Sequence, residues 1–149
     1  MPIEKKYVCQ NRKARFDFEV LEVIEAGIVL LGTEIKSVRD HHVSLDGAYA
    51  IVTDAREVSL IDCNIEPYSH GNVNNHESKR PRKLLLHRKE IRNFAEKASI
   101  KGFTLIPLGI YMVKGRAKVE LGVCRGKQLH DKRQAIKDRD VKKELRKFA

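Results

Sequence analysis

Cysteine is scarce in this sequence, and its few copies show no pairing pattern. The three residues, Cys9, Cys63 and Cys124, lie far apart along 149 residues. An odd number of distant cysteines, without Cys-x-x-Cys or Cys/His spacing, argues against both a disulfide framework and a zinc site. The histidines show no metal-ligand spacing with Cys, Asp or Glu either. We therefore expect no metal, and a protein of a reducing cytoplasm.

Long apolar runs and catalytic motifs are missing as well. Runs such as 28–31 and 84–86 are far shorter than the ~20 residues of a membrane span. The N-terminus has no apolar signal core, and the chain has no Walker loop for a nucleotide cofactor. No nucleophile stands near a placed base, since the pairs 41–42 and 62–63 are adjacent residues that point to opposite faces of a strand. We expect a cytoplasmic monomer with no membrane contact, no cofactor and no enzyme activity.

What the sequence does contain is positive charge in two blocks. The net charge is +10, yet residues 1–78 hold eight Lys/Arg against thirteen Asp/Glu. Residues 79–92 hold seven Lys/Arg and one Glu, and residues 125–149 hold ten Lys/Arg and four Asp/Glu. Clustered Lys and Arg neutralise phosphates and release counterions. The two blocks therefore favour a nucleic acid as the partner over an anionic membrane surface.

Hydrophobic periodicity predicts short strands with a few helices. Alternation indicates strands near 16–24, 28–31, 104–113 and 116–125, a turn at 26–27, and a hairpin of about six residues per strand around Tyr49 and Val58. A phase shift at 21–24 predicts a bulge. Thr33 is the expected N-cap of a short helix. Apolar residues at i, i+3, i+4 and i+7 from Ile91 predict a second helix, closed by Gly102.

These elements predict one globular domain with mainly β structure. Six short strands with interposed helices indicate a closed antiparallel barrel of the OB type, with two to three helices, over residues 14–126. Residues 1–13 are expected to form a flexible leader and residues 127–149 a basic C-terminal tail.

The first basic block holds the candidate RNA contacts, although a solvated loop and helix face would also explain it. Its crowded positive groups repel one another unless a polyanion is near, so we expect it to be exposed and to pair with phosphate. Leu85 follows Leu84 in an extended segment and can face outward to contact a base. Glu25 can accept hydrogen bonds from base amino or imino groups, or be only a turn residue. His87 stands where a helix N-cap is expected.

The tail combines an apolar helical spacing with many positive charges. Leu129, Ile136, Val141 and Leu145 keep a rough helical register. Like charges at i, i+4 make such a helix marginal in water, so folding upon binding is expected. His130 can stack on a base or be only a linker residue.

Six segments in sequence order resemble one family, the SsrA-binding proteins, also called small protein B. They are NRKAR (11–15), EAGI (25–28), GTEIKS (32–37), KRPRKLLLH (79–87), KVELGV (118–123) and GKQLHDKR (126–133). Together they cover essentially the whole chain. The sequence departs from the family pattern at Arg12, where Lys is common, and at Gln128, where a basic residue is common.

The resemblance implies an adaptor of trans-translation whose OB-like barrel binds the tRNA-like domain of transfer-messenger RNA. It also implies a tail, disordered when unbound, that becomes helical in the empty mRNA channel of a stalled ribosome, allowing peptide tagging. With the charge map, it gives the expected RNA-binding residues Glu25, Lys79, Arg80, Arg82, Lys83, Leu85, His87 and Lys118. The expected ribosome-binding residues are Lys127, His130, Asp131, Lys132, Arg133, Ile136, Lys137 and Arg139.

Two other functions stay open from the sequence. One is a ribosomal or single-strand-binding OB protein without a rescue role, and the other is a basic nuclease. Binding to a tRNA-like fold with little single-strand affinity would separate the adaptor from the first. Release of nucleotide fragments would support the second.

Overall fold

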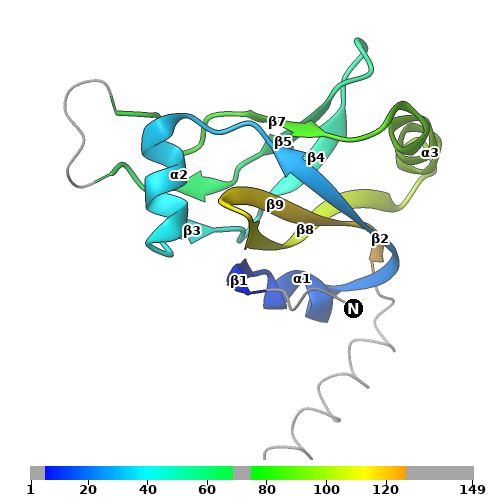
Figure 1. Ribbon diagram of the computed structural model, residues 1–149. Helices are drawn as coiled ribbons and strands as arrows, with labels where there is room; N and C mark the ends of the chain where they lie inside the picture. The colour runs from blue at the N-terminus through cyan, green and yellow to red at the C-terminus, as the bar shows by residue number, and fades with distance from the viewer. Residues whose placement is uncertain (1–5, 69–74, 127–149) are drawn as a thin grey trace, which may run out of the picture.

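The computed structural model describes residues 6–68 and 75–126 (Figure 1). Along the chain the elements are β1 (Tyr7–Gln10), α1 (Arg12–Asp17), β2 (Phe18–Ile28), α2 (Gly32–Arg39), β3 (Val43–Ser44), β4 (Tyr49–Val52), β5 (Val58–Ile61), β6 (Asn64–Ile65), β7 (Arg82–Leu85), α3 (Arg88–Ala98), β8 (Phe103–Val113) and β9 (Arg116–Gly126). Within these ranges no helix is both long and apolar enough to cross a membrane.

Six strands close into a ring. Their order is β8-β4-β5-β7-β2-β9, and β9 pairs back onto β8. β1 is added to the outside of the ring by antiparallel pairing with β8. Figure 1 shows α2 and α3 on opposite sides of this ring. The predicted OB-like antiparallel barrel of about six strands with three helices is therefore confirmed.

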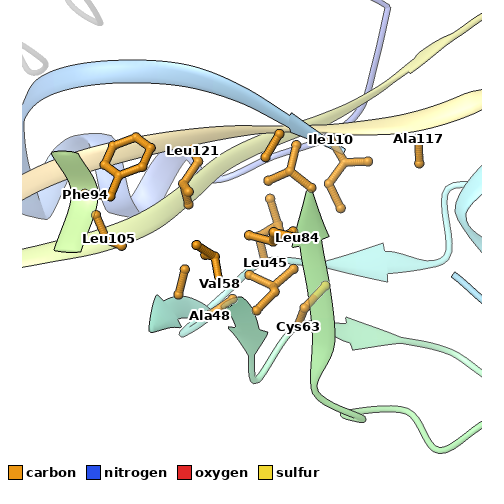
Figure 2. Close-up of a cluster of buried hydrophobic side chains, with 14 of the residues drawn as sticks. Leu45, Ala48, Val58, Cys63, Leu84, Phe94, Leu105, Ile110, Ala117 and Leu121 are labelled. Atoms are coloured by element: carbon orange, nitrogen blue, oxygen red, sulfur yellow. The ribbon is translucent and has the colours of Figure 1, made fainter. Parts of the chain in front are cut away.

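The barrel interior is filled by aliphatic side chains from every strand of the ring. Leu84 from β7, Leu105 from β8 and Leu121 from β9 are each at most 2% exposed. Phe94 from α3 is fully buried and lies among them (Figure 2). The apolar stripe predicted for this helix therefore anchors it to the barrel, and the left-handed Gly102 (φ +90°) follows where the helix ends.

A second, smaller core lies on the other face of the β8–β9 hairpin. Ala14 from α1 packs there with Ile106, Leu108 and Cys124. An ideal Cβ on Gly122 would lie 2.9 Å from Cδ1 of Leu108, so glycine is what leaves room for this leucine. The β8–β9 hairpin matches the strands predicted near 104–113 and 116–125, and α1 covers part of its second face.

The leader prediction is wrong for residues 7–13. Tyr7–Gln10 forms β1, and α1 begins at Arg12. Asn11 explains why this segment is structured. Its buried side chain accepts a hydrogen bond from the backbone N–H of Ala14 at 3.1 Å and donates one to the carbonyl of Pro107 at 3.0 Å. This N-cap ties α1 to β8. Residues 1–5 lie outside the described part of the chain.

β2 differs from its prediction in length and in where it ends. Its start lies after α1, at Phe18, and it continues through the expected turn at 26–27 to Ile28. It does so because β9 pairs with it as far as Gly27 and β7 then pairs with Gly27 and Ile28. The predicted separate strand at 28–31 is therefore wrong, whereas the predicted bulge is confirmed between Val20 and Glu22.

Two smaller predictions also need correction. α2 is capped at Leu31, not Thr33, because the Glu34 carboxylate accepts the Leu31 backbone N–H at 2.8 Å. The hairpin of β4 and β5 is confirmed, but each strand has four residues.

Candidate nucleic-acid interface

A hollow of about 330 Å³ opens where β2, β7 and β9 meet the start of α3. It brings together four of the residues predicted to bind RNA, although they come from three separate segments of the chain. Its lining consists of Glu25, Gly27, Leu85, Leu86, His87, Glu90 and Lys118.

The register of three strands places Leu85 in one row with two other residues that line this hollow. Leu85 on β7 lies opposite Gly27 on β2, which in turn lies opposite Lys118 on β9. An ideal Cβ on Gly27 would lie 3.2 Å from the Leu85 Cβ, so the glycine lets Leu85 lie close over β2. Leu84 points into the core and Leu85 is 51% exposed, which confirms the outward orientation predicted for it. Leu85 therefore presents an exposed apolar surface in the hollow.

His87 and Lys118 add an aromatic ring and a positive charge to the hollow. His87 is the N-cap residue of α3, as predicted, and its backbone N–H donates to Glu90 Oε1 at 2.9 Å. Its side chain is exposed, and that of Lys118 is half-buried. An imidazole can stack on an unpaired base, and an ammonium group can pair with phosphate.

Glu25 gives the hollow its hydrogen-bond acceptor. The hydroxyl of Tyr111 donates to Glu25 Oε2. Tyr111 is buried, and burial together with the Glu25 hydrogen bond and charge raises the pKa of its phenol above the ordinary value. The phenol therefore stays a donor, and the exposed carboxylate stays available as an acceptor for base N–H groups.

Arg82 was expected to be exposed and to bind RNA, and its predicted exposure is wrong. Its side chain is fully buried, with Nε 2.5 Å from Glu34 Oε2. Nη1 donates to the carbonyl of Cys63 at 2.8 Å and Nη2 to that of Ser78 at 3.1 Å. The alternation that turns Leu85 outward turns Arg82 inward, so the strand period was the signal that would have identified it.

Glu34 is the buried partner of two arginines. Burial would raise the pKa of its carboxyl, but hydrogen bonds from Arg80, the Leu31 backbone N–H and Arg82 outweigh it and hold the pKa below its ordinary value. The Arg80 Nη2 lies 2.6 Å from Glu34 Oε1. This cluster ties α2 to β7 and to the segment that precedes it.

The remaining predicted basic residues lie outside the hollow. Lys79 is exposed. Lys83 is half exposed and pairs with Glu57 at 3.2 Å, an exposed ion pair of the kind worth at most about 1 kcal/mol. Both lysines can therefore turn to phosphate at little cost.

Sequence reasoning missed Tyr111, Gly27 and Glu90. Tyr111 belongs to a long apolar strand and does not stand out in the sequence. Only the register of β8 against β9 shows that it lies beside Lys118. The predicted ribosome-binding residues, all C-terminal to Gly126, lie outside the described residues. In the part of the chain that is described, no group of three or more His, Cys, Asp or Glu side chains could hold a metal ion.

Comparisons with known proteins point to one family. The family model described as "SmpB protein" matches residues 8–149. The SsrA-binding protein of Chlamydia pneumoniae is 51% identical over 141 residues, which cover 95% of this chain and 93% of that protein. The SsrA-binding protein of Sphingomonas elodea is 52% identical over 140 residues, 93% of this chain and 87% of the relative.

A solved structure shares the fold as well as the sequence. It is described as "tmRNA-SmpB: a journey to the center of the bacterial ribosome", and one of its chains superposes with a TM-score of 0.69 at 44% sequence identity. The match covers 85% of this chain and 92% of the other. Sequence and fold thus agree along the barrel, and the chain belongs to the SmpB protein family.

Proposed function

We propose that this chain is an RNA-binding adaptor that binds the tRNA-like domain of transfer-messenger RNA and delivers it to stalled ribosomes for trans-translation. The observation that carries the proposal is the hollow in which Glu25, Leu85, His87 and Lys118 meet. The choice of transfer-messenger RNA is supported by the relatives of this chain that are named SsrA-binding protein. The related chain in a tmRNA-SmpB structure supports it as well.

Each side chain of the hollow has a distinct part in this proposal. Leu85 packs against an unpaired base, His87 stacks on a base, and Glu25 accepts a hydrogen bond from a base amino or imino group. Lys118 pairs with phosphates, and so do the exposed Lys79 and Lys83, which shortly precede Leu85 in the sequence. Glu25, Leu85 and Lys118 lie on strands of the closed ring, and His87 caps α3, so their backbone positions are fixed before RNA binds.

The tail has a separate part in the proposal. The strands β2 and β9 run antiparallel, with Gly27 opposite Lys118 at the hollow and Phe18 opposite Gly126 at the other end. At about 3.3 Å per residue, these two ends are at most about 30 Å apart. The barrel therefore binds RNA at one end of this strand pair, and the tail leaves it at the other. We propose that the tail then enters the empty mRNA channel, with Lys127, His130, Asp131, Lys132, Arg133, Ile136, Lys137 and Arg139 as ribosome contacts.

The test replaces Glu25, Leu85 and His87 together by Ala and measures affinity for a transcript of the tRNA-like domain. Each base interaction removed is worth about 1–3 kcal/mol, so the triple variant should bind at least a hundredfold more weakly while it keeps its melting temperature. A matched control replaces His42, Glu66 and Ile100, which are exposed residues of the same chemical kinds outside the hollow.

The comparison ligand is an unstructured RNA of the same length and charge. The adaptor function requires that the wild-type protein prefer the tRNA-like transcript. Equal binding of both RNAs would favour a single-strand-binding OB protein. If the hollow triple variant bound as tightly as the control triple variant, the hollow would not be the RNA site.

A further inference from the structure

We propose that Tyr111 is a positioning residue for Glu25, holding its carboxylate in one orientation at the hollow so that it is ready to accept a base N–H. The inference rests on the proposed function, because it concerns the same RNA-binding site. It assigns a part in recognition to a side chain that is itself buried and does not line the hollow.

The strand register carries the first step. Tyr111 on β8 lies opposite Lys118 on β9, and Lys118 lies opposite Gly27 on β2. Glu25 is two residues before Gly27 and so shares its face of the sheet. The Tyr111 hydroxyl reaches across β9 to donate to Glu25 Oε2. A buried donor on one strand therefore holds an exposed acceptor two strands away.

Tyr111 is fixed in turn by the strand added outside the ring. The rings of Tyr7 and Tyr111 meet edge to face, with centroids 5.7 Å apart and an interplanar angle of 75°. Aromatic pairs of this geometry are stabilising. The donor is thus packed against a neighbour that limits the positions its hydroxyl can take.

A second carboxylate makes the hydrogen bond to Glu25 more important. Glu120 on β9 lies directly opposite Glu25, and like charges in opposite positions repel. Glu120 accepts from the Tyr7 hydroxyl at 2.5 Å and pairs with Arg15 at 2.7 Å. Glu25 accepts a hydrogen bond from the Tyr111 hydroxyl, and this bond offsets the repulsion between Glu25 and Glu120.

Both tyrosines remain donors under physiological conditions. The pKa of Tyr7 is raised by its hydrogen bond to Glu120 and by burial, and that of Tyr111 by burial and by Glu25. A side chain already ordered by such a bond loses little conformational freedom when a ligand binds. The expected benefit is therefore in affinity for RNA that presents base donors at this point.

The test is a double-mutant cycle on the full-length protein, with affinity measured for the tRNA-like transcript. Tyr111→Phe keeps the ring and removes the hydroxyl, and should weaken binding about three- to tenfold, the cost of leaving one side chain unordered before binding. In the Glu25→Ala background, the same Tyr111→Phe change should have no further effect. A merely structural role would weaken both backgrounds equally, and that result would overturn the inference.

Tyr7→Phe is the matched control, because it removes the equivalent hydroxyl from Glu120, which does not line the hollow. The variant keeps the ring that packs against Tyr111 and should leave affinity within about twofold, since neither Tyr7 nor the buried Glu120 is proposed to contact RNA. If Glu25→Ala weakens binding but Tyr111→Phe does not, the inference fails and the proposed site stands. If Glu25→Ala has no effect, the site assignment fails and the inference with it.

A measurement on the wild-type protein keeps the inference testable should Tyr111→Phe fail to fold. NMR three-bond couplings of Glu25 in the unbound protein should report a single side-chain rotamer. Couplings averaged over several rotamers would overturn the inference, because they would show that Tyr111 does not hold the carboxylate.

Discussion

Glu34 and Arg82 form a fully buried ion pair, with the arginine Nε 2.5 Å from the carboxylate Oε2. The pair joins α2 to β7, and Arg82 also holds the backbone carbonyls of Cys63 and Ser78. Breaking such a buried pair from one side is costly, and loss of Arg82 would leave Glu34 with the half-buried Arg80 as its remaining ion-pair partner. Arg82, which was expected to pair with phosphate, therefore stabilises the fold.

Arg82→Ala should destabilise the protein by about 3–5 kcal/mol, because Glu34 loses a buried partner. Urea unfolding followed by circular dichroism measures this loss. Lys83→Ala, the neighbouring residue with an exposed ion pair, is the control and should cost at most about 1 kcal/mol. Equal losses for the two variants would contradict the structural role of Arg82.

The same cluster predicts how stability depends on acid. The pKa of Glu34 is lower in the folded protein than its ordinary value of 4.5, so the unfolded chain binds its proton first. The stability that this group supplies is present above pH 4.5 and is lost as the pH falls through the lower folded value. Glu34→Gln should therefore be less stable at neutral pH but show a shallower acid loss, as urea midpoints between pH 6 and 3 would show. Parallel curves for variant and wild type would contradict this.

Affinity for the tRNA-like transcript should fall steeply with salt. Replacing Lys79 and Lys83 by Gln should flatten the plot of log affinity against log salt by up to about two units, one for each phosphate that is no longer neutralised. Arg82 is left in place because it is buried. Lys101 and Lys114, which are exposed and outside the hollow, provide the control pair. An equal change of slope for both pairs would mean that the attraction is not local.

Gly27 should matter for RNA binding through Leu85. In Gly27→Val the new side chain would displace Leu85 from its place over β2, and binding should weaken by about 1–3 kcal/mol, as when a base interaction is removed. Gly32→Ala is the matched control, because nothing lies within 4 Å of an ideal Cβ there. Isothermal titration with the transcript measures both. Unchanged binding by Gly27→Val would remove Leu85 from the site.

Deleting residues 130–149 should separate RNA binding from ribosome rescue. The barrel keeps the whole hollow, so affinity for the transcript should drop only because the non-specific attraction of the tail is gone. Peptide tagging on ribosomes without mRNA downstream of the P site should collapse. Within the tail, His130→Ala should impair accommodation if this ring stacks on a base. Equal tagging by truncated and full-length protein at saturation would contradict the two-part proposal.

Much of the barrel could be predicted because its strands alternate clearly. The β8–β9 hairpin, α3 with its buried Phe94, and the outward face of Leu85 all follow from local periodicity. The start of the chain was misread because Asn11 donates hydrogen bonds to backbone carbonyls of β8, nearly a hundred residues away. A continuous β2 was missed because strands β9 and β7 support it in turn, which no local pattern reveals.

The site was predicted in part for the same reason. Glu25, Leu85, His87 and Lys118 were identified as separate residues, and only the register places them around one hollow. Arg82 was misassigned because charge was given more weight than strand alternation. Tyr111 could not be found from sequence, since its partner Glu25 lies across an intervening strand.

The pairing of β2 with β9 also fixes the distance between the hollow and the C-terminal end of β9. The two strands pair from Phe18 to Gly27, with one bulge between Val20 and Glu22, so the hollow and Gly126 keep a constant separation. If the barrel tilted on its RNA, Gly126 would move by a distance proportional to the tilt angle. Any change in the distance between the hollow and the ribosome-binding residues must therefore arise outside this strand pair. Two residues inserted into each strand would increase the distance that the pair fixes by about 7 Å without changing the hollow or the end of β9.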